Sequence, residues 1–384
     1  MKCSGINALT GRPAEVVFGK TIESVGPAAA GAADYIAPGW IDLQVNGFAG
    51  VDYNFPAAPH EEIARSIRVL FSTGVTRFYP TVITGSPEDM CGALRNLADA
   101  KERLEEGEAI EGIHVEGPHI SPEDGPRGAH PKRWVRRPDL DEFRRMQEAA
   151  RGLIRLVTLS PEWPEAPRYI EALVDQGVVV SIGHMNANAA QIADAVSAGA
   201  TMSTHLGNGA HAVLPRHPNY LWEQLAEDRL TAGFIVDGIH LPASFLKTAL
   251  RAKGPERAVL VTDAAMPAGC APGRYKLGEQ EVELTPDNRV VLAGGTRLAG
   301  SALRMDRGIE NLMRLAGLTL AEAVRLATVN PARAARIEGR QKGLETGERG
   351  DVVRLRYLPE THQVYIEETW LGGEQVYSGT MTPD

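Results

Sequence analysis

The feature that most constrains the fold is a regular alternation of short apolar runs with segments of helical spacing. Eight runs have the length and β-branched composition of buried strands, at residues 41–45, 75–82, 109–115, 154–159, 178–182, 201–204, 230–236 and 258–262. Each is followed by a plausible helix or a long loop. Eight such units favour an α/β fold, and a closed (β/α)8 TIM barrel more readily than an open sheet.

The two ends of the chain have a different pattern. Residues 1–36 hold short, weakly alternating segments, and residues 345–384 hold alternating runs such as DVVRLRYL and HQVYIEETWL. These runs predict a small β-sandwich domain that both ends build together, with the barrel over residues 37–344. A chain of 384 residues with 43% hydrophobic content is long enough for a barrel with such an appendage.

The composition excludes several classes of partner. The formal net charge is −9 and there is no lysine or arginine block, which argues against nucleic acid and against an anionic membrane surface, because both need a concentrated positive face. No apolar run approaches the ~18 residues of a membrane span, and no secretory signal is visible. Three separate cysteines fit a reducing compartment. We therefore expect a cytoplasmic protein with a small-molecule substrate, which would need a local positive pocket if anionic.

Polar residues gather at the ends of the predicted strands. Because parallel strands end at one edge of a barrel, where such folds place their chemistry, we expect these residues to meet. They are Gln44, Asn46, His114, Glu116, His184, His205, Asp237, His240 and Asp263. His114 could be a donor to a metal ligand or a packed barrel residue, and its place within a strand slightly favours packing.

One subset of these residues matches a metal site. A carboxylate with two histidines forms a three-ligand zinc site that keeps a position for water, and Glu116, His184 and His205 supply that set. Asp263 could then take a proton from the water and give it to a leaving amine. Taken singly, each residue has a simpler explanation: a strand-end hydrogen bond for a histidine, an ion pair with Arg127 for Glu116, or a helix cap for Asp263. Four such groups at four strand ends favour the metal site.

Two long segments also follow predicted strands: residues 119–138, rich in Pro, Gly and charge, and the turn-rich residues 269–300. Barrel enzymes build their sites on such loops, although a long loop can also be a tolerated surface insertion. A third polar stretch, HLGNGAH, is followed by LPRHP. Its glycines leave backbone N–H groups free to face an anion, and Arg216 could clamp a phosphate or carboxylate. The alternative is an ordinary polar loop with a solvated arginine.

Ten short segments fall in a characteristic order along nearly the whole chain. They are PGWIDLQVNG (38–47), FYPTVIT (78–84), GIHVEGPHI (112–120), GAHP (128–131), SIGHMNA (181–187), THLGN (204–208), VDGIH (236–240), LVTDAAMPAG (260–269), LAGSAL (298–303) and ATVNPAR (327–333). In this order they resemble the N-acetylglucosamine-6-phosphate deacetylase family of the amidohydrolase superfamily. The resemblance implies a (β/α)8 barrel with a small β-sandwich, and deacetylation of N-acetylglucosamine 6-phosphate to glucosamine 6-phosphate and acetate.

The resemblance also implies roles for single residues. Glu116, His184 and His205 would bind one divalent metal per subunit, usually zinc. Asp263 would act as general base and acid, and His130 would polarise the acetamide carbonyl or steady the developing oxyanion.

The remaining implied roles concern the sugar phosphate and the metal count. Asn208, the backbone of Gly209, Arg216 and His240 would hold the sugar phosphate, some of them across the interface of a homodimer. Members with a second metal carry a His-x-His pair at the first strand. Gln44 and Asn46 stand at that vestigial second-metal position here, which implies a single metal.

The departures from the family lie around the substrate. Gly207 and the pair Gly209-Ala210 replace an aromatic residue and a small-residue/Met pair, His119 replaces an apolar or aromatic residue, and residues 211–218 are rich in histidine and proline. Two alternatives therefore stay open. One is the same hydrolysis on a non-phosphorylated N-acyl sugar or another small amide, and the other is a catalytically silent binding module.

Overall fold

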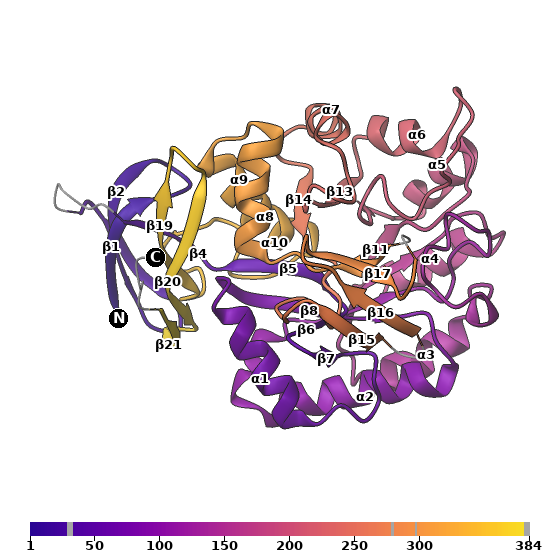
Figure 1. The fold of residues 1–384 in the computed structure, drawn as a ribbon, viewed down its shortest axis with the longest axis horizontal. Coiled ribbons are helices and arrows are strands. Elements are labelled where there is room, and N and C mark those ends of the chain that lie inside the picture. The colour runs from indigo at the N-terminus through magenta and orange to yellow at the C-terminus, as the bar shows by residue number, and fades with distance from the viewer. Residues whose placement is uncertain (29–33, 278–279, 296–297, 380–384) are drawn as a thin grey trace.

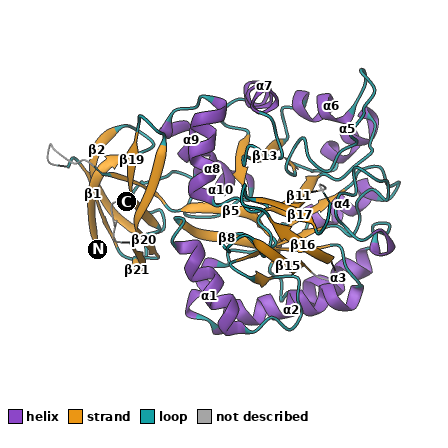
Figure 2. Ribbon diagram, in the orientation of Figure 1, coloured by secondary structure: helices purple, strands orange, loops and turns teal. Residues whose placement is uncertain are grey.

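The computed structural model describes residues 1–28, 34–277, 280–295 and 298–379. A large unit of eight parallel strands ringed by helices lies beside a smaller β domain that holds both ends of the described chain (Figure 1). Figure 2 shows that the helices surround the large sheet and that none lies on the side of the small domain that faces away from the barrel. The predicted (β/α)8 barrel with a small β-sandwich is confirmed.

The barrel strands follow each other around the ring in chain order. They are β5 (Trp40–Val45), β8 (Val75–Ile83), β9 (Ile113–Glu116), β10 (Ile154–Leu159), β11 (Val179–Ile182), β12 (Met202–Ser203), β13 (Thr231–Ile235) and β14 (Ala258–Val261). A parallel bridge between Val45 and Ala264 joins the last strand to the first. All eight predicted strands are confirmed. The third begins at Ile113 and not at residue 109, because a 3₁₀ turn occupies Glu105–Ala109.

Ten helices of the described residues cover the outside of the ring or lie beside it. They are α1 (His60–Phe71), α2 (Pro87–Arg103), α3 (Leu140–Ala149), α4 (Ala166–Val174), α5 (Ala189–Ser197), α6 (Tyr220–Ala226), α7 (Ala243–Lys253), α8 (Met305–Asn311), α9 (Leu320–Ala327) and α10 (Val329–Ala334). Local sequence sets where they begin. Asn188 and Thr319, for example, form capping boxes that satisfy the first N–H groups of α5 and α9.

The small domain is one seven-stranded sheet that folds over its own core. Its strands, in spatial order, are β21 (Glu374–Ser378), β20 (Gln363–Leu371), β19 (Val352–Leu358), β4 (Tyr35–Pro38), β1 (Lys2–Asn7), β2 (Arg12–Phe18) and β3 (Ile22–Gly26). Phe18 of β2 and Trp370 of β20 are not on neighbouring strands, yet their rings lie 5.7 Å apart at 80°. This contact closes the sandwich. The boundaries after residues 36 and 344 stay a prediction.

The segment after β14 differs from the expected turn-rich loop. It contains a four-stranded antiparallel sheet of β15 (Gly273–Leu277), β16 (Gln280–Leu284), β17 (Arg289–Leu292) and β18 (Leu298–Ser301). The alternation of polar and apolar residues in these strands explains the sheet, because it gives the sheet one apolar face. The residues Val282, Leu284, Val290 and Ala299 form a buried cluster there. The Ser301 N–H donates to the Asp263 carbonyl at 3.3 Å, which ties the sheet to the end of β14.

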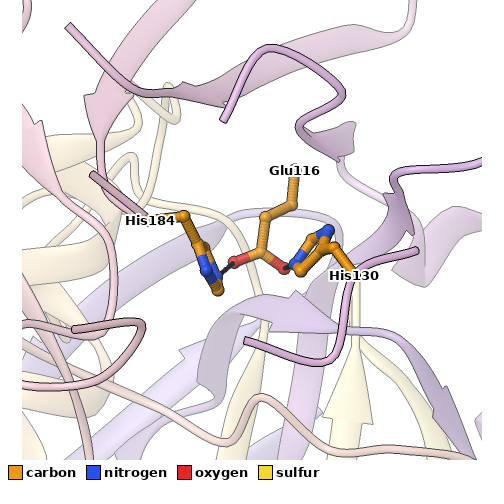
Figure 3. A group of neighbouring side chains, drawn as sticks. All are labelled: Glu116, His130 and His184. Carbon is orange, nitrogen blue, oxygen red and sulfur yellow. Dashed lines mark hydrogen bonds and ion pairs between the residues drawn. The ribbon is translucent and has the colours of Figure 1, made fainter. Parts of the chain in front are cut away.

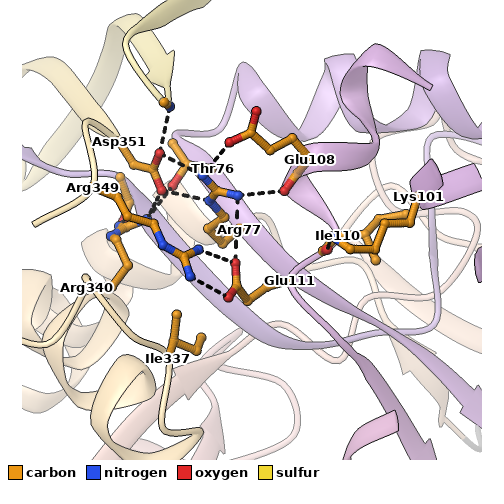
Figure 4. A network of polar contacts seen from close by, with 12 residues as sticks. Thr76, Arg77, Lys101, Glu108, Ile110, Glu111, Ile337, Arg340, Arg349 and Asp351 are labelled. Atoms are coloured by element: carbon orange, nitrogen blue, oxygen red, sulfur yellow. Dashed lines mark hydrogen bonds and ion pairs between the residues drawn. The ribbon is translucent and has the colours of Figure 1, made fainter. Parts of the chain in front are cut away.

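A buried ionic network joins the small domain to the barrel (Figure 4). Asp351, just before β19, accepts from Arg77 of β8 at 2.8 and 3.1 Å, from the Gly372 N–H at 2.8 Å, and from Arg340. Arg77 also donates to the backbone and side chain of Glu108 at 2.7 and 3.0 Å. Because Asp351 and both arginines are buried, each charge depends on the others.

Among the described residues, no helix has the length and apolar character that crossing a membrane would need.

Candidate active site

Three of the strand-end residues have an unusual backbone. His184, His205 and Asp263 follow β11, β12 and β14, and their φ angles are 49°, 26° and 49°. Such values are uncommon for residues other than glycine and cost conformational energy, and in folded proteins they concentrate at functional sites. The turn at each position aims the side chain across the mouth of the barrel.

Glu116, His184 and His205 converge on one point. The Oε1 atom of Glu116 lies 3.1 Å from Nε2 of His184 and 2.9 Å from Nε2 of His205, and the two Nε2 atoms are 3.0 Å apart. The His184 Nδ1–H donates to the Pro126 carbonyl at 2.7 Å, which leaves its Nε2 as a lone-pair donor. Two imidazole nitrogens and a carboxylate oxygen at such spacing fit the ligand set of a divalent metal.

Charge within this cluster favours an ionised carboxylate. Burial alone would raise the pKa of Glu116, but hydrogen bonds and charge from His184 and His205 hold it well below its usual range. Burial likewise would lower the pKa of His205, whereas Glu116 raises it. The three groups therefore form an anionic carboxylate site that a cation would satisfy.

His130 lies beside the cluster (Figure 3). Its Nε2 is 3.9 Å from Oε2 of Glu116, and the ligand atoms of Glu116, His130 and His184 all lie within 4.8 Å of one another. The Nδ1 atom of His130 is 2.8 Å from the Thr84 hydroxyl. Burial lowers the pKa of His130 to about 3, so its imidazole is neutral. We assign the tighter set with His205 to the candidate metal site, because its three atoms are mutually within 3.1 Å.

The two amides at the end of β5 bind carboxylates. Gln44 donates to Oε1 of Glu116 at 2.9 Å, and Asn46 donates to Oδ1 of Asp263 at 2.6 Å. Burial, with a contribution from the charge of Glu116, raises the pKa of Asp263 to about 6. A carboxylate with such a pKa can both accept and release a proton near neutral pH.

A cavity of about 1040 Å³ opens over these groups. Glu116, His130, His184, His205 and Asp263 line its floor, and Asn46, Asn208, Gly209 and His240 also border it. The Nδ1–H of His240 donates to Asp237 at 2.6 Å, which fixes the ring. A side chain at Gly209 would place its Cβ 2.7 Å from Nδ1 of His184, so only glycine allows this close approach.

The chain is similar to known amidohydrolases in sequence. The family model of the amidohydrolase family matches residues 35–376. The chain is 36% identical over 354 residues to the N-acetylglucosamine-6-phosphate deacetylase of Bos taurus, covering 89% of this chain and 83% of the relative. It is 32% identical over 343 residues to the N-acetylgalactosamine-6-phosphate deacetylase of Escherichia coli O157:H7, covering 89% of this chain and 88% of the relative.

A solved structure agrees with these relatives. The N-acetyl-D-glucosamine-6-phosphate deacetylase of Mycobacterium smegmatis, in complex with N-acetyl-D-glucosamine 6-phosphate, superposes with a TM-score of 0.88 at 30% identity, over 98% of this chain and 99% of that one. The chain belongs to the N-acetylglucosamine-6-phosphate deacetylase family of amidohydrolases. It is thus a hydrolase that acts on amide bonds.

The structure places two residues of this amidohydrolase for which the sequence left alternatives open, Arg216 and His114. Arg216 is exposed on the loop before α6, and the described lining of the cavity does not include it. His114 is buried, with Nε2 2.8 Å from the Thr158 hydroxyl, and so is a packed barrel residue. Neither alternative for Glu116 and Asp263 holds, since Arg127 donates to the His130 carbonyl and Asp263 begins no helix.

Sequence reasoning missed two residues of this site. Thr84, which holds His130, directly follows β8, and the strand-end rule would have found it had the second strand been searched. Asp42 is fully buried within β5 and accepts hydrogen bonds from Thr262 and from the Gln44 N–H. Burial raises the pKa of Asp42 to about 7. Asp42 belongs to the segment PGWIDLQVNG, but it stands inside the strand, so the strand-end rule does not single it out.

Proposed function

We propose that this amidohydrolase removes acetate from N-acetylglucosamine 6-phosphate and releases glucosamine 6-phosphate. The observation that carries the proposal is the convergence of Glu116, His184 and His205 within 3.1 Å, in a barrel whose relatives at 30–36% identity include deacetylases of this substrate. A silent binding module is disfavoured, because Asp263 and the metal-competent cluster border the same cavity.

The proposed cofactor is one divalent metal per subunit, Zn²⁺, held by Glu116, His184 and His205. Zinc bound by a carboxylate and two imidazoles supplies a Lewis acid that acidifies water and polarises a carbonyl. The amide groups of Gln44 and Asn46 donate to Glu116 and Asp263. They stand where relatives with a second metal carry two histidines, and amides are not among the usual zinc ligands, which supports a single metal.

The chain's own side chains would move the protons. Asp263 takes a proton from the attacking water, and gives it to the sugar nitrogen as the C–N bond breaks. Neutral His130 donates from Nε2 to the carbonyl oxygen as negative charge develops there. Together these steps release a carboxylate and a free amine.

A direct test replaces Asp263 with asparagine, which has nearly the same shape but cannot carry a proton. Turnover of N-acetylglucosamine 6-phosphate should fall by about 100- to 10,000-fold. Bound metal, measured by elemental analysis, should stay at about one ion per chain, because the proposed ligands are intact. Asp287→Asn removes an exposed carboxylate and serves as the control. Normal turnover in Asp263→Asn would contradict the role of Asp263 as the proton carrier.

The phosphate is proposed to bind at Asn208, the backbone of Gly209 and His240, with Arg216 supplied by a second subunit. Arg216 lies outside the described lining of its own cavity, and apolar Val213 and Trp222 near it are 87% and 49% exposed. Exposed apolar side chains around an arginine support a homodimer interface at this face. The cytoplasmic location stays a prediction.

Mixing two inactive variants tests this arrangement. Asp263→Asn lacks the proton carrier, and Arg216→Ala lacks the phosphate ligand. If Arg216 acts in the neighbouring subunit, a mixed dimer has one complete site, and an equimolar mixture should recover about a quarter of normal activity. No recovery after subunit exchange, or a monomer in light scattering, contradicts the shared site. If Arg216→Ala does not change the preference for phosphorylated over unphosphorylated sugar, the phosphate role is wrong and the non-phosphorylated alternative gains support.

A further inference from the structure

The cavity extends well beyond the groups proposed to hold the sugar phosphate. Its volume of about 1040 Å³ is at the upper end of the range for small-ligand pockets, about 300–1,000 Å³. Asn208 and His240 follow β12 and β13, and Asp263 follows β14. The ring order places β8 four strands away from β12, on the opposite side of the mouth. Apart from Asn46 and Thr84, which hold Asp263 and His130, the wall over β5 and β8 has no role in the reaction proposed above.

Part of that wall is an apolar patch, which we call the apolar lobe, and polar residues such as Ser86, Asp89 and Arg133 also line the cavity beside it. The residues of the apolar lobe include Phe55, Pro56, Val82, Met90 and Trp134. Val82 and Met90 are buried, whereas Phe55 is 54% exposed. An apolar surface that lines one side of a polar active site favours an apolar part of the ligand.

The apolar lobe is held rigidly to the barrel. Asn54, the residue before Phe55, donates to the carbonyls of Asn46 and Thr81 at 3.3 and 3.2 Å and accepts from the Ile83 N–H at 2.7 Å. These three hydrogen bonds fix Phe55 beyond the ends of β5 and β8.

The rest of the apolar lobe is anchored as firmly. Pro56 packs on α2 so closely that a Cβ at Gly92 would lie 2.8 Å from its ring. Across the lobe, Arg136 donates to the carbonyls of Trp134 and Gly85 at 2.6 and 3.0 Å. Pro56 and Trp134 are thus both held against residues that follow β8, the first by packing and the second through the hydrogen bonds of Arg136.

The positions of the catalytic groups determine which part of the substrate faces the apolar lobe. The leaving nitrogen and its sugar face Asp263, on the side of β12, β13 and β14. The carbonyl oxygen faces His130, whose Nδ1 is held by Thr84. The acyl substituent is the group that remains, and the part of the cavity beyond Asn46 and Thr84, lined by the apolar lobe, is left for it.

We propose that the apolar lobe binds the acyl substituent, and that the enzyme hydrolyses N-acylglucosamine 6-phosphates with acyl chains longer than acetyl. This inference rests on the proposed function. Water adds to the amide carbon, the C–O bond forms, the C–N bond breaks, and Asp263 carries the proton to the nitrogen. The products are glucosamine 6-phosphate and the longer carboxylate.

A series of substrates tests the inference. The wild-type enzyme is given N-acetyl-, N-propionyl-, N-butyryl- and N-hexanoylglucosamine 6-phosphate, and release of the free amine is measured. Each methylene that enters the apolar lobe can raise kcat/KM by up to about fourfold. We expect kcat/KM for the butyryl and hexanoyl compounds to equal or exceed that for the acetyl compound. A fall of more than about 100-fold from acetyl to butyryl would overturn the inference and leave the proposed function intact.

Failure of this inference and failure of the proposed function give different results. If only the longer amides are hydrolysed, the apolar lobe is supported and the assigned acetyl substrate is wrong. If no compound is hydrolysed, the proposed function fails and the inference with it.

The variant Phe55→Ala tests whether the acyl chain contacts the apolar lobe at Phe55. Because Phe55 is half-exposed, its truncation should not unfold the protein, and the ratio of kcat/KM for hexanoyl over acetyl should fall at least about fivefold. Val25→Ala, a partly exposed apolar residue of β3 in the small domain, should leave the ratio unchanged. An unchanged ratio in Phe55→Ala contradicts contact between Phe55 and the acyl chain.

Discussion

At the residue scale, the site depends on which nitrogen of each histidine carries the proton. His184 is fixed by the carbonyl of Pro126, which takes its Nδ1–H and leaves Nε2 for a metal. His130 needs the opposite tautomer if it is to donate from Nε2 to a carbonyl oxygen. Its Nδ1 must then accept a hydrogen bond, and the hydroxyl of Thr84 lies 2.8 Å away.

Thr84→Val tests this role, because valine keeps the shape and removes the hydroxyl. We expect kcat to fall by about 10- to 100-fold with little change in KM, since the lost interaction stabilises the developing oxyanion and not the bound substrate. Thr84→Ser keeps the donor and should retain most of the activity. Equal losses in both variants would show that the methyl packing of Thr84, and not its hydroxyl, supports the site.

At the scale of elements, the β15–β18 sheet holds the strand end that carries Asp263. Ser301 of β18 donates to the Asp263 carbonyl, and the Ala265 N–H donates to the Ser301 carbonyl at 2.9 Å. Gly300 makes this close approach possible, since a Cβ there would lie 2.8 Å from Cβ of Ala265. The sheet is therefore a support for the proton carrier as well as a wall of the cavity.

Gly300→Ala should displace the Ala265 segment and lower kcat about tenfold or more, because misplacement of a catalytic group by a fraction of an ångström is costly. Gly294→Ala is the matched control. Gly294 lies in the same sheet region, also has a positive φ of 76°, and has no atom within 4 Å of an added Cβ. Both variants place alanine at a positive φ, 106° at Gly300 and 76° at Gly294, and only Gly300→Ala adds the clash. Similar kcat values in the two would refute support by the sheet.

The barrel and the proposed metal ligands could be predicted because both follow from a simple rule. Strands that alternate with helices make a parallel ring, and residues at the strand ends meet at one edge. Thus Glu116, His184, His205 and Asp263 were expected together, and the structure brings them to one cavity. The rule says nothing of loops. This is why residues 269–300 were expected to be turn-rich, and why Arg216 was left open between a phosphate ligand and a solvated arginine.

Contacts between distant segments could not be predicted from the sequence either. The pairing of Thr84 with His130 joins residues 46 positions apart, and that of Asp351 with Arg77 joins residues 274 apart. Such pairs depend on side-chain directions within the finished fold, and no local pattern of spacing encodes them.

At the scale of the whole molecule, the network around Asp351 holds the two parts of the fold together. Two buried arginines and a backbone N–H stabilise its ionised form, so the pKa of Asp351 falls to about 2 despite its burial. Asp351→Asn leaves the charges of Arg77 and Arg340 without this partner. We expect a loss of about 3–5 kcal/mol in the free energy of unfolding, measured by urea titration, with Asp287→Asn near zero.

The Asp351 carboxylate also predicts how the free energy of unfolding changes in acid. The folded pKa of Asp351 is depressed, so its stabilisation is fully present above the unfolded value of 3.8 and is lost as the pH falls towards about 2. Unfolding free energy should therefore drop more steeply between pH 4 and pH 2 in the wild type than in Asp351→Asn, by roughly 2 kcal/mol. Parallel curves for the two proteins would exclude this contribution.

The seven-stranded sheet of the small domain has a consequence for biosynthesis. Strand β4 pairs with β1 on one side and with β19 on the other, yet β19 begins at Val352 and β4 ends at Pro38. At about 5–20 residues per second, a ribosome needs roughly 15 to 60 seconds to make the intervening chain. During that interval the first four strands carry an unpaired edge, which is the part of a nascent sheet that most readily recruits other chains. Because of this delay, we expect the protein to aggregate more slowly when it is expressed at a low rate. We also expect chaperones that cover strand edges to protect it.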